Sequence, residues 1–252
     1  MTEILAIANQ KGGVGKTTTA INLGAALAAL ERRILLVDCD PQGNATRGLG
    51  ATAARPHLYH VLSGQAEAAD AVQPSGFPNL DLIPADRDLV GVEVEFPGLE
   101  RWEHRLAEAL APIADDYATV LLDCPPSLGH LTVAALTAAT GVLVPLQCEY
   151  FALEGIRDLV STIDRVRGAL NPRLDIAGIV LTMFDDRTNL GQDVAAEARR
   201  VFGDKVYGTV VPRNVRLAEA PSHGVPVLAY DIKCRGAVAY LDLAREVLGV
   251  AA

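Results

Sequence analysis

A short apolar run leads straight into a glycine-rich loop near the start of the chain. Residues Ile4–Ala8 have the length and composition of a strand, and Gly12, Gly13 and Gly15 follow before a helix expected over Thr17–Leu30. Glycines let backbone N–H groups turn inward without side-chain clashes, and the N-terminus of a helix favours negative charge. This order of strand, loop and helix predicts a phosphate-binding loop, and it restricts the chain to folds that alternate strands with helices.

Two side chains of the loop can act on a bound nucleotide. Lys16 can reach the β- and γ-phosphates, and the Thr17 hydroxyl can bind Mg²⁺ directly. The strict pattern G-x-x-x-x-G-K-[ST] is not met, because Gln10 stands where its first glycine belongs and Lys11 adds a second lysine. We expect nucleotide contacts along the whole loop, from Lys11, Gly12, Gly13, Val14, Gly15, Lys16, Thr17 and Thr18.

Beyond the loop, short apolar runs alternate with helical patterns. This alternation predicts a single α/β domain with a doubly wound, mainly parallel sheet and helices on both faces. The stretch 51–79 is the least regular, and we expect it to pack as an extra helical layer. The expected strands are Ile4–Ala8, Arg33–Asp38, Leu80–Pro84, Thr119–Asp123, Gly141–Leu146 and Ile176–Met183, and the expected helices are Thr17–Leu30, Glu100–Ala114, 152–170, 190–202 and 235–248.

Aspartates stand at the carboxyl ends of two predicted strands. Asp38 and Asp40 end or follow one strand, and Asp123 ends another after four apolar residues, in a Walker B pattern. Ligands of doubly wound sheets bind beyond the carboxyl ends of the strands, so these carboxylates should face the nucleotide. We expect Asp123 to hold Mg²⁺ through water. An acid at a strand end can also cap a helix, but the nearby phosphate loop favours the metal role.

Composition limits the possible partners and the redox chemistry. The formal net charge is −9, so the chain is not a globally basic nucleic-acid protein, and any DNA contact must come from particular arginines. The four cysteines are widely spaced without a C-x-x-C pair, which predicts reduced, mostly buried thiols rather than a metal site. The N-terminus lacks a secretory pattern and no apolar stretch reaches membrane-spanning length, so we expect a cytoplasmic protein.

Several segments together resemble one family. The loop K-G-G-x-G-K-T, with its extra Lys11, resembles the deviant Walker A motif of the ParA/MinD family of ATPases. The resemblance extends over almost the whole chain and is strongest to the Soj branch, the small chromosomal ParA proteins, which lack an N-terminal DNA-reading domain. Besides the loop, it rests on Asn9–Lys11, Asp40–Asn44, Gln147–Gly155, Thr182–Asn189 and Pro212–Ser222.

This resemblance implies an ATPase with ATP and Mg²⁺ at the site. Lys11, Lys16 and Asp40 would be catalytic, with Lys11 crossing a dimer interface to the partner's phosphates and Asp40 positioning the attacking water. Asp38 would help to organise the lysines and, with Asp40 and Asp123, the water-mediated shell of Mg²⁺. Pro212 and Asn214 match a segment that lines the base, although an ordinary Pro-Asn turn explains them as well.

For the Soj branch, the resemblance implies segregation of chromosomes or plasmids on the nucleoid. ATP would drive formation of a homodimer, the dimer would bind double-stranded DNA without sequence preference, and a ParB-type centromere-binding partner would stimulate hydrolysis. Taken singly, each arginine of the chain could be an ordinary solvated charge. The candidate DNA contacts are Arg187 and Arg216, which match family positions, then Arg213, Lys233 and Arg235, and finally Arg199 and Arg200.

Other functions within reach of the motifs remain open. A MinD-like regulator would need a basic amphipathic C-terminal helix, but residues 242–252 hold one cation and two acids, so we expect no membrane binding. An ATP-dependent ligase, or a reductase with an iron–sulfur cluster bridged between subunits by cysteines, is a metabolic alternative. A tyrosine kinase is disfavoured because the tyrosines are dispersed. The same DNA-bound cycle also positions other cargo, such as carboxysomes or chemoreceptor arrays.

Overall fold

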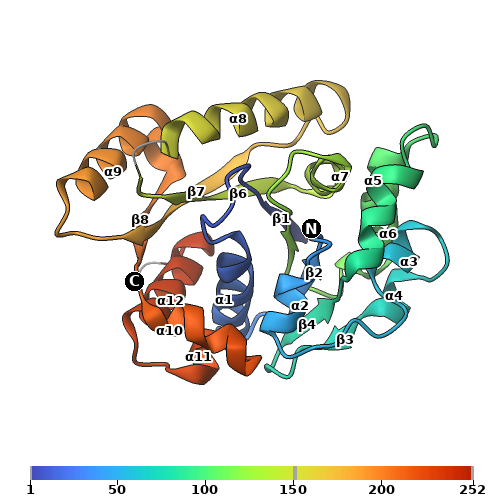
Figure 1. Cartoon of the computed structure of the whole chain (residues 1–252), viewed down its shortest axis with the longest axis horizontal. Helices are drawn as coiled ribbons and strands as arrows, with labels where there is room; N and C mark the ends of the chain where they lie inside the picture. Colours follow the sequence, from blue (N-terminus) through green and yellow to red (C-terminus); the bar gives the residue numbers. More distant parts are fainter. Residues whose placement is uncertain (1, 150–151, 251–252) are drawn as a thin grey trace.

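The computed structural model describes residues 2–149 and 152–250, which form one eight-stranded sheet with helices on both faces (Figure 1). The strand order is β3-β4-β2-β5-β1-β6-β7-β8, and every neighbouring pair is parallel except β3 and β4. The predicted doubly wound sheet is therefore confirmed. The strands are β1 (Glu3–Ile7), β2 (Ile34–Asp38), β3 (Gln73–Pro74), β4 (Leu80–Ile83), β5 (Thr119–Asp123), β6 (Gly141–Gln147), β7 (Ile176–Phe184) and β8 (Val206–Pro212).

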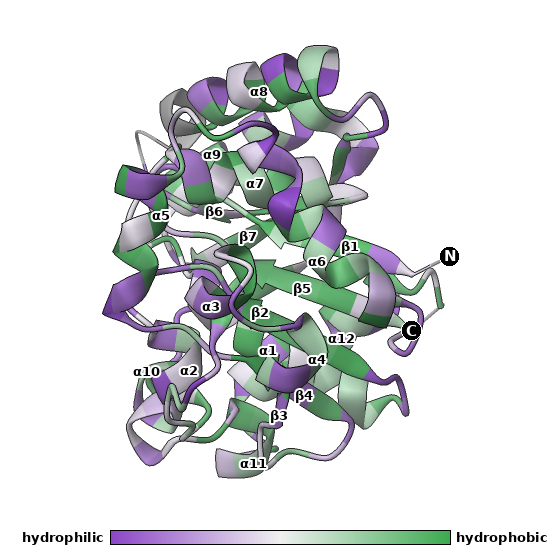
Figure 2. Cartoon of the chain, turned by 90° about the vertical axis from the view of Figure 1, so that its right-hand side faces the viewer, coloured by the Kyte–Doolittle hydropathy of each residue, from purple (hydrophilic) through white to green (hydrophobic). Residues whose placement is uncertain are grey.

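The central strands are buried on both faces because their side chains alternate between two apolar cores. Leu5 and Ile7 belong to one core, whereas Ala6 and Ala8 belong to the other. Period-two alternation of this kind sends successive side chains to opposite faces of the sheet. Figure 2 shows the resulting hydrophobic strands between helices that carry hydrophilic residues.

Two helical layers cover the sheet. Helix α1, which follows the phosphate loop, packs with its neighbours on one face, and α8 and α9 lie on the opposite face (Figure 1). The first layer contains α1 (Lys16–Ala29), α2 (Asn44–Gly48), α10 (Val215–Glu219), α11 (Val227–Tyr230) and α12 (Arg235–Val247). The second contains α3 (Leu58–Leu62), α4 (Ala68–Ala71), α5 (Gly91–Glu95), α6 (Arg105–Ala114), α7 (His130–Ala138), α8 (Ala152–Ala169) and α9 (Asn189–Phe202).

Several sequence-based expectations were wrong. The helix expected from Glu100 begins only at Arg105, because Arg101 adopts a left-handed φ of 55° and a 3₁₀ turn follows it. The stretch 51–79 forms no extra layer, since α3 and α4 pack beside α6 in the second layer. The expectation of free thiols is confirmed for all four cysteines, but only Cys39 and Cys124 are fully buried, whereas Cys148 and Cys234 are half-buried.

Several short elements escaped the sequence patterns, and the longest of those missed are α7 and β8. Helix α7 is apolar on all sides and mostly buried, so it has no amphipathic period to detect. Strand β8 lies at the edge of the sheet and mixes exposed with buried residues. No helix within residues 2–149 and 152–250 is long and apolar enough to cross a membrane. Tyr150 and Phe151, which belong to the family-like segment 147–155, lie outside the described residues.

The strand order places the predicted site residues at one edge of the sheet. In the parallel register, Asp123 at the end of β5 pairs with Ile7 of β1 on one side and with Asp38 of β2 on the other. The phosphate loop follows β1, so loop and carboxylates meet where these three strands end.

Candidate nucleotide-binding site and basic cleft

The glycine loop forms a cradle of backbone groups. Gly13 and Gly15 have φ values of 76° and 92°, in the left-handed region that other residues rarely adopt. A Cβ atom on Gly12 or Gly13 would meet no atom within 4 Å, so open space lies above the loop. The loop then enters α1, whose first N–H groups add their partial positive charge. This geometry fits an anionic phosphate chain.

Side chains from neighbouring segments hold the loop in place. Asn9 accepts a hydrogen bond from the Lys11 N–H at 3.0 Å and donates one to the Pro145 carbonyl at 2.8 Å. The Thr182 hydroxyl of β7 donates to the Val14 carbonyl at 2.8 Å. The loop is therefore tied to β6 and β7 on one side, which fixes its conformation before any ligand arrives.

Lys16 is buried inside the loop that it serves. Only 7% of the residue is exposed, and its Nζ donates to the Lys11 carbonyl at 3.1 Å. Burial lowers the pKa of Lys16, while the nearby charges of Asp123 and Asp40 oppose this change. Because the ammonium already points into the cradle, little rearrangement is needed for it to meet a phosphate.

Asp123 supports the predicted magnesium site most directly. It is fully buried, and neither carboxylate oxygen finds a hydrogen-bond partner among the residues that the structure describes. Burial, reinforced by the charge of Asp38, raises the pKa of Asp123 well above its usual range. The neighbouring Thr17 hydroxyl lowers this pKa, although its geometry is not that of a regular hydrogen bond. A buried carboxylate without a partner is costly, and a hydrated divalent cation would supply what it lacks. The residues therefore fit Mg²⁺.

Asp38 and Asp40 occupy different places. Asp38 lies behind the cavity, where it accepts bonds from the Thr46 N–H at 2.8 Å, the Thr46 hydroxyl at 2.7 Å and the Asp40 N–H at 3.2 Å. Burial raises its pKa to about 6. Asp40 lines the cavity and accepts a bond from the Gln42 N–H at 2.9 Å. Asp40 therefore lines the space expected to hold the phosphates, whereas Asp38 does not.

The phosphate space is a cavity of about 260 Å³. It brings together most of the predicted loop residues and Asp40, and adds three residues that sequence reasoning missed. Its lining consists of Gly12, Gly13, Gly15, Lys16, Thr17, Thr18, Asp40, Asn44, Pro126 and Met183. Met183 has a left-handed φ of 51° at the end of β7, an unusual conformation for a residue with a side chain.

A second cavity of about 510 Å³ adjoins the first and shares Gly15, Thr18 and Met183 with it. It is lined by Pro212 and Asn214, as the resemblance implied, and by apolar side chains of the β8–α10 segment. A flat aromatic base fits such a pocket. Asn214 also caps α10, because its Oδ1 accepts a bond from the Arg216 N–H at 2.9 Å. It is therefore both a turn residue and a pocket residue.

Lys11 is held within its own chain. Its Nζ lies 2.8 Å from Oε2 of Glu149, and the side chains are 36% and 49% exposed. The other oxygen of Glu149 accepts a bond from Gln147. Glu149 lies in the segment quoted for the resemblance, but its spacing of 138 residues from Lys11 gave no signal of this contact.

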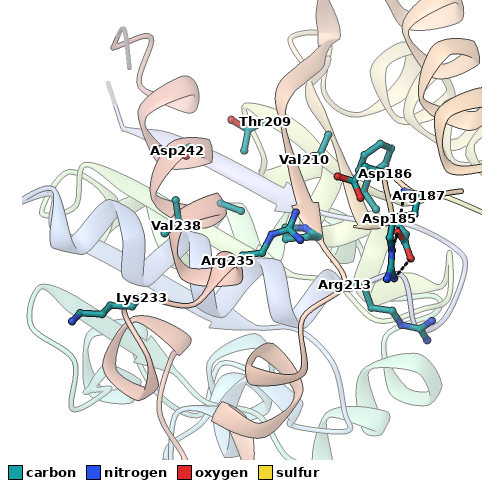
Figure 3. A pocket seen from close by; sticks show the side chains of 13 residues that line it. Asp185, Asp186, Arg187, Thr209, Val210, Arg213, Lys233, Arg235, Val238 and Asp242 are labelled. Atoms are coloured by element: carbon teal, nitrogen blue, oxygen red, sulfur yellow. Dashed lines mark hydrogen bonds and ion pairs between the residues drawn. The ribbon is translucent and has the colours of Figure 1, made fainter.

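Four of the candidate DNA-binding residues line a cleft of about 680 Å³, which we call the basic cleft (Figure 3). They come from the end of β7, the end of β8 and the start of α12, and three acids lie among them. The charged lining residues are Arg187, Arg213, Lys233, Arg235, Asp185, Asp186 and Asp242.

The cations of the basic cleft differ in whether they form ion pairs with acidic side chains. Arg187 is 84% exposed but pairs with Asp185 at 2.7 and 2.8 Å, which lowers the pKa of that carboxyl to about 2. Arg213, Lys233 and Arg235 make no ion pair within the described part of the chain. These three are therefore available to an external anion.

The other candidate arginines do not line the basic cleft. Arg216 pairs with Glu219 at 2.7 Å and approaches Asp231 at 3.6 Å. Arg199 and Arg200 lie on α9, where Arg200 pairs with Glu197. Their expected share in the DNA contact gains no geometric support here.

Comparison with known proteins identifies the family. Residues 2–176 match a family model described as an AAA domain. The chain is 60% identical over 249 residues to the chromosome partitioning protein ParA of Caulobacter vibrioides, covering 97% of this chain and 93% of that protein. It is 53% identical over 250 residues to the sporulation initiation inhibitor protein Soj of Bacillus subtilis, covering 98% of each. The chain belongs to the ParA/Soj family of P-loop ATPases. The assignment made from the sequence is confirmed.

A solved structure with a similar fold contains a bound nucleotide. The chain has a TM-score of 0.86 and 39% identity to a Mycobacterium smegmatis protein described as cobyrinic acid a,c-diamide synthase, crystallised with ADP and magnesium. The match covers 98% of this chain and 94% of that one. That protein therefore binds, in a similar fold, a nucleotide and magnesium, the two ligands that the cavities of this chain fit.

Proposed function

We propose that this chain is an ATPase that dimerises with ATP, binds double-stranded DNA without sequence preference, and segregates chromosomes or plasmids with a ParB-type partner. One observation supports the link between nucleotide and DNA. Pro212 and Arg213 line both the basic cleft and the second cavity of about 510 Å³, which we call the base pocket. A nucleotide in the pocket therefore touches the wall of the cleft. The chain is 60% and 53% identical to proteins named ParA and Soj, but 39% identical to a protein named as a synthase. This difference favours segregation over a ligase function.

The chain's own groups divide the work of hydrolysis. The loop N–H groups and Lys16 bind the phosphates, and Lys16 stabilises the charge that develops on the transferred group. Asp40, on the cavity wall, orients the attacking water. Thr17 directly and Asp123 through water would hold Mg²⁺, which when bound would neutralise phosphate charge. Asp38 acts indirectly, because its hydrogen bonds hold Asp40 and Thr46 in place.

We propose that the DNA contact lies in the basic cleft. A few phosphate contacts give weak, salt-dependent binding, on the order of 10⁻⁴–10⁻⁶ M per non-specific site. Two clefts in an ATP-bound dimer would act together, so DNA binding would rise steeply with dimerisation. We place the protein on the nucleoid in the cytoplasm for this reason.

The C-terminal helix α12 is not free to bind a membrane in the way a MinD-like protein requires. Its Glu246 accepts bonds from the Gly208 and Thr209 N–H groups at 2.6 and 2.9 Å, and its Arg245 pairs with Asp242 at 2.8 Å. The helix is thus fastened to β8. We favour DNA over lipid as the surface that this protein binds.

The deciding experiment measures ATP hydrolysis with DNA, with the N-terminal peptide of a ParB-type protein, with both, and with neither. We expect synergistic stimulation when both are present. Equal rates in all four conditions would contradict the partner-coupled function, and equal DNA retention with and without ATP would contradict the nucleotide link.

Replacing Arg213 or Arg235 with alanine is expected to weaken ATP-dependent DNA binding for every DNA sequence alike. Each loss of one phosphate contact should reduce the slope of log K against log salt by about 1. Fluorescence anisotropy over a series of salt concentrations measures this slope. Arg173→Ala is the matched control, since this exposed arginine precedes β7 at the opposite end of that strand. An unchanged slope in both cleft variants would place the DNA contact elsewhere.

Glu149→Gln is expected to strengthen ATP-dependent dimerisation by up to about fivefold, because a half-exposed ion pair contributes roughly 0–1 kcal/mol. The variant frees Lys11 from its own chain, so more of it is ready for the partner's phosphates. Sedimentation in the presence of ATP measures the dimer fraction. Glu67→Gln, an exposed acid at the start of α4, is the control. Weaker dimerisation of Glu149→Gln would show that Glu149 supports the interface instead.

A further inference from the structure

Three potential metal ligands meet at the carboxyl end of β4, outside the nucleotide site. They belong to His57, Asp86 and Asp88, and one ligand atom from each lies within 4.8 Å of the other two. His57 immediately precedes α3, whereas the aspartates begin the 3₁₀ turn Arg87–Val90. About thirty residues separate the two segments in the sequence, so no spacing motif announced the cluster.

His57 is the feature that needs an explanation. Its side chain is completely buried, and neither ring nitrogen makes a hydrogen bond to any residue that the structure places. Buried polar groups are nearly always hydrogen-bonded, and leaving one without a partner costs free energy. Nε2 points toward the aspartates, 3.4 Å from Asp86 Oδ1 and 3.9 Å from Asp88 Oδ2.

The geometry points to a site for a divalent transition ion of the Zn²⁺ class, held by His57, Asp86 and Asp88. Imidazole favours such ions over Mg²⁺ or Ca²⁺, which prefer oxygen ligands alone. In a tetrahedral zinc site, bonds of about 2.0–2.1 Å put ligand atoms roughly 3.3 Å apart. The His57–Asp86 separation already matches this value, and the half-exposed Asp88 must move in by about half an ångström. Water would complete the coordination.

The surroundings permit an ion to enter and bind. Asp86 and Asp88 are 40% and 47% exposed, so the carboxylates form the open side of the site while His57 forms its floor. Asp86 is already oriented, because its Oδ1 accepts a bond from the Asp88 N–H at 2.9 Å. Arg55 competes for Asp88, at 3.2 Å, but is 75% exposed and can swing into water.

Binding would clamp two loops that flank the nucleotide site. Leu58 donates its N–H to the Pro84 carbonyl at 3.0 Å, and the Ala85 N–H donates to the Thr46 hydroxyl at 3.0 Å. Thr46 in turn holds Asp38. The ion would therefore stabilise the loop that supports Asp38, without touching the nucleotide.

The test titrates metal-stripped, nucleotide-free full-length protein with Zn²⁺ in the presence of excess Mg²⁺, by calorimetry, and repeats it with Co²⁺, whose visible spectrum reports the coordination geometry. We expect one Zn²⁺ per chain, a higher melting temperature, and a Co²⁺ spectrum of tetrahedral type. Asp86→Asn and Asp88→Asn should each weaken binding by more than about 10-fold, since even changes outside the ligand shell cost 10–100-fold.

Two choices keep the result interpretable. In the Asp86→Asn variant the side-chain amide oxygen can still accept the bond from the Asp88 N–H, and both aspartate side chains are partly exposed, so the two variants should fold. His57→Gln serves as a third variant after a check of its circular dichroism. Asp70→Asn, an exposed acid on α4, is the control and should bind as the unaltered chain does. Absence of stoichiometric binding, or binding that Asp86→Asn and Asp88→Asn leave unchanged, would overturn the proposal.

Discussion

Lys16→Ala should abolish ATP-dependent DNA retention and reduce ATP turnover by at least about 10²–10³-fold, the loss typical of removing one preorganised group that stabilises transition-state charge. The effect should be large because Lys16 is almost fully buried in the loop, where water cannot replace its charge. It also lies near the buried carboxylates of Asp123 and Asp40, whose negative charge it offsets. Phosphate release and a fluorescent ATP analogue measure turnover and binding separately.

The control for this variant is Lys205→Ala. Lys205 pairs with Asp175 at 2.6 Å and is 41% exposed, on the 3₁₀ turn that precedes β8. Turnover and DNA retention should stay near those of the unaltered chain. Normal turnover in the folded Lys16→Ala protein would contradict the assignment of the glycine loop as the phosphate site.

Asp40→Ala should separate binding from hydrolysis. We expect the variant to bind ATP, dimerise and remain on DNA, while turnover falls by about 10²–10⁴-fold, the range for losing a group that positions and activates water. The reason is geometric, since Asp40 lines the phosphate cavity but belongs to neither the glycine loop nor the base pocket. Single-turnover phosphate release with DNA present measures the loss.

Asp40→Asn refines this test. Its Oδ1 can still accept the Gln42 N–H bond that Asp40 accepts at 2.9 Å, so the local turn is kept while the negative charge is removed. If Asp40 acts through its charge on water, Asn should be as inactive as Ala. Recovery of turnover in Asp40→Asn would assign Asp40 a role in holding the turn. Failure of either variant to bind ATP would show that Asp40 is needed for binding itself.

Much of the fold followed from local signals. The strands of the parallel sheet are continuous apolar runs, and α8 repeats buried residues such as Ile156, Leu159 and Ile163 at helical spacing, so both were predicted near their observed bounds. Helix α7 and strand β8 were not, because burial on all sides hides the helical period and an edge strand has no uniform burial. The start of α6 depended on the left-handed conformation of Arg101, which no residue pattern announced.

The candidate site shows the same division. The loop residues and the aspartates were read from residue types at strand ends, and the structure gathers Lys16, Thr17 and Asp40 around one cavity. The Lys11–Glu149 contact spans 138 residues of sequence, and Met183 reaches the site only because β7 ends beside the loop. Such contacts are set by strand order, which local sequence does not encode.

The sequence by itself determined the chemistry: a glycine loop with two lysines, acids at the ends of apolar strands, and hence a phosphate site of the ParA/Soj type. Backbone freedom, charge and helix polarity act within a few residues, so they can be read locally. Only the tertiary structure decided which acid lines the cavity beside the glycine loop, which arginines share the basic cleft, and that His57 meets Asp86 and Asp88. These outcomes depend on which distant segments pack together, and packing is a property of the whole chain.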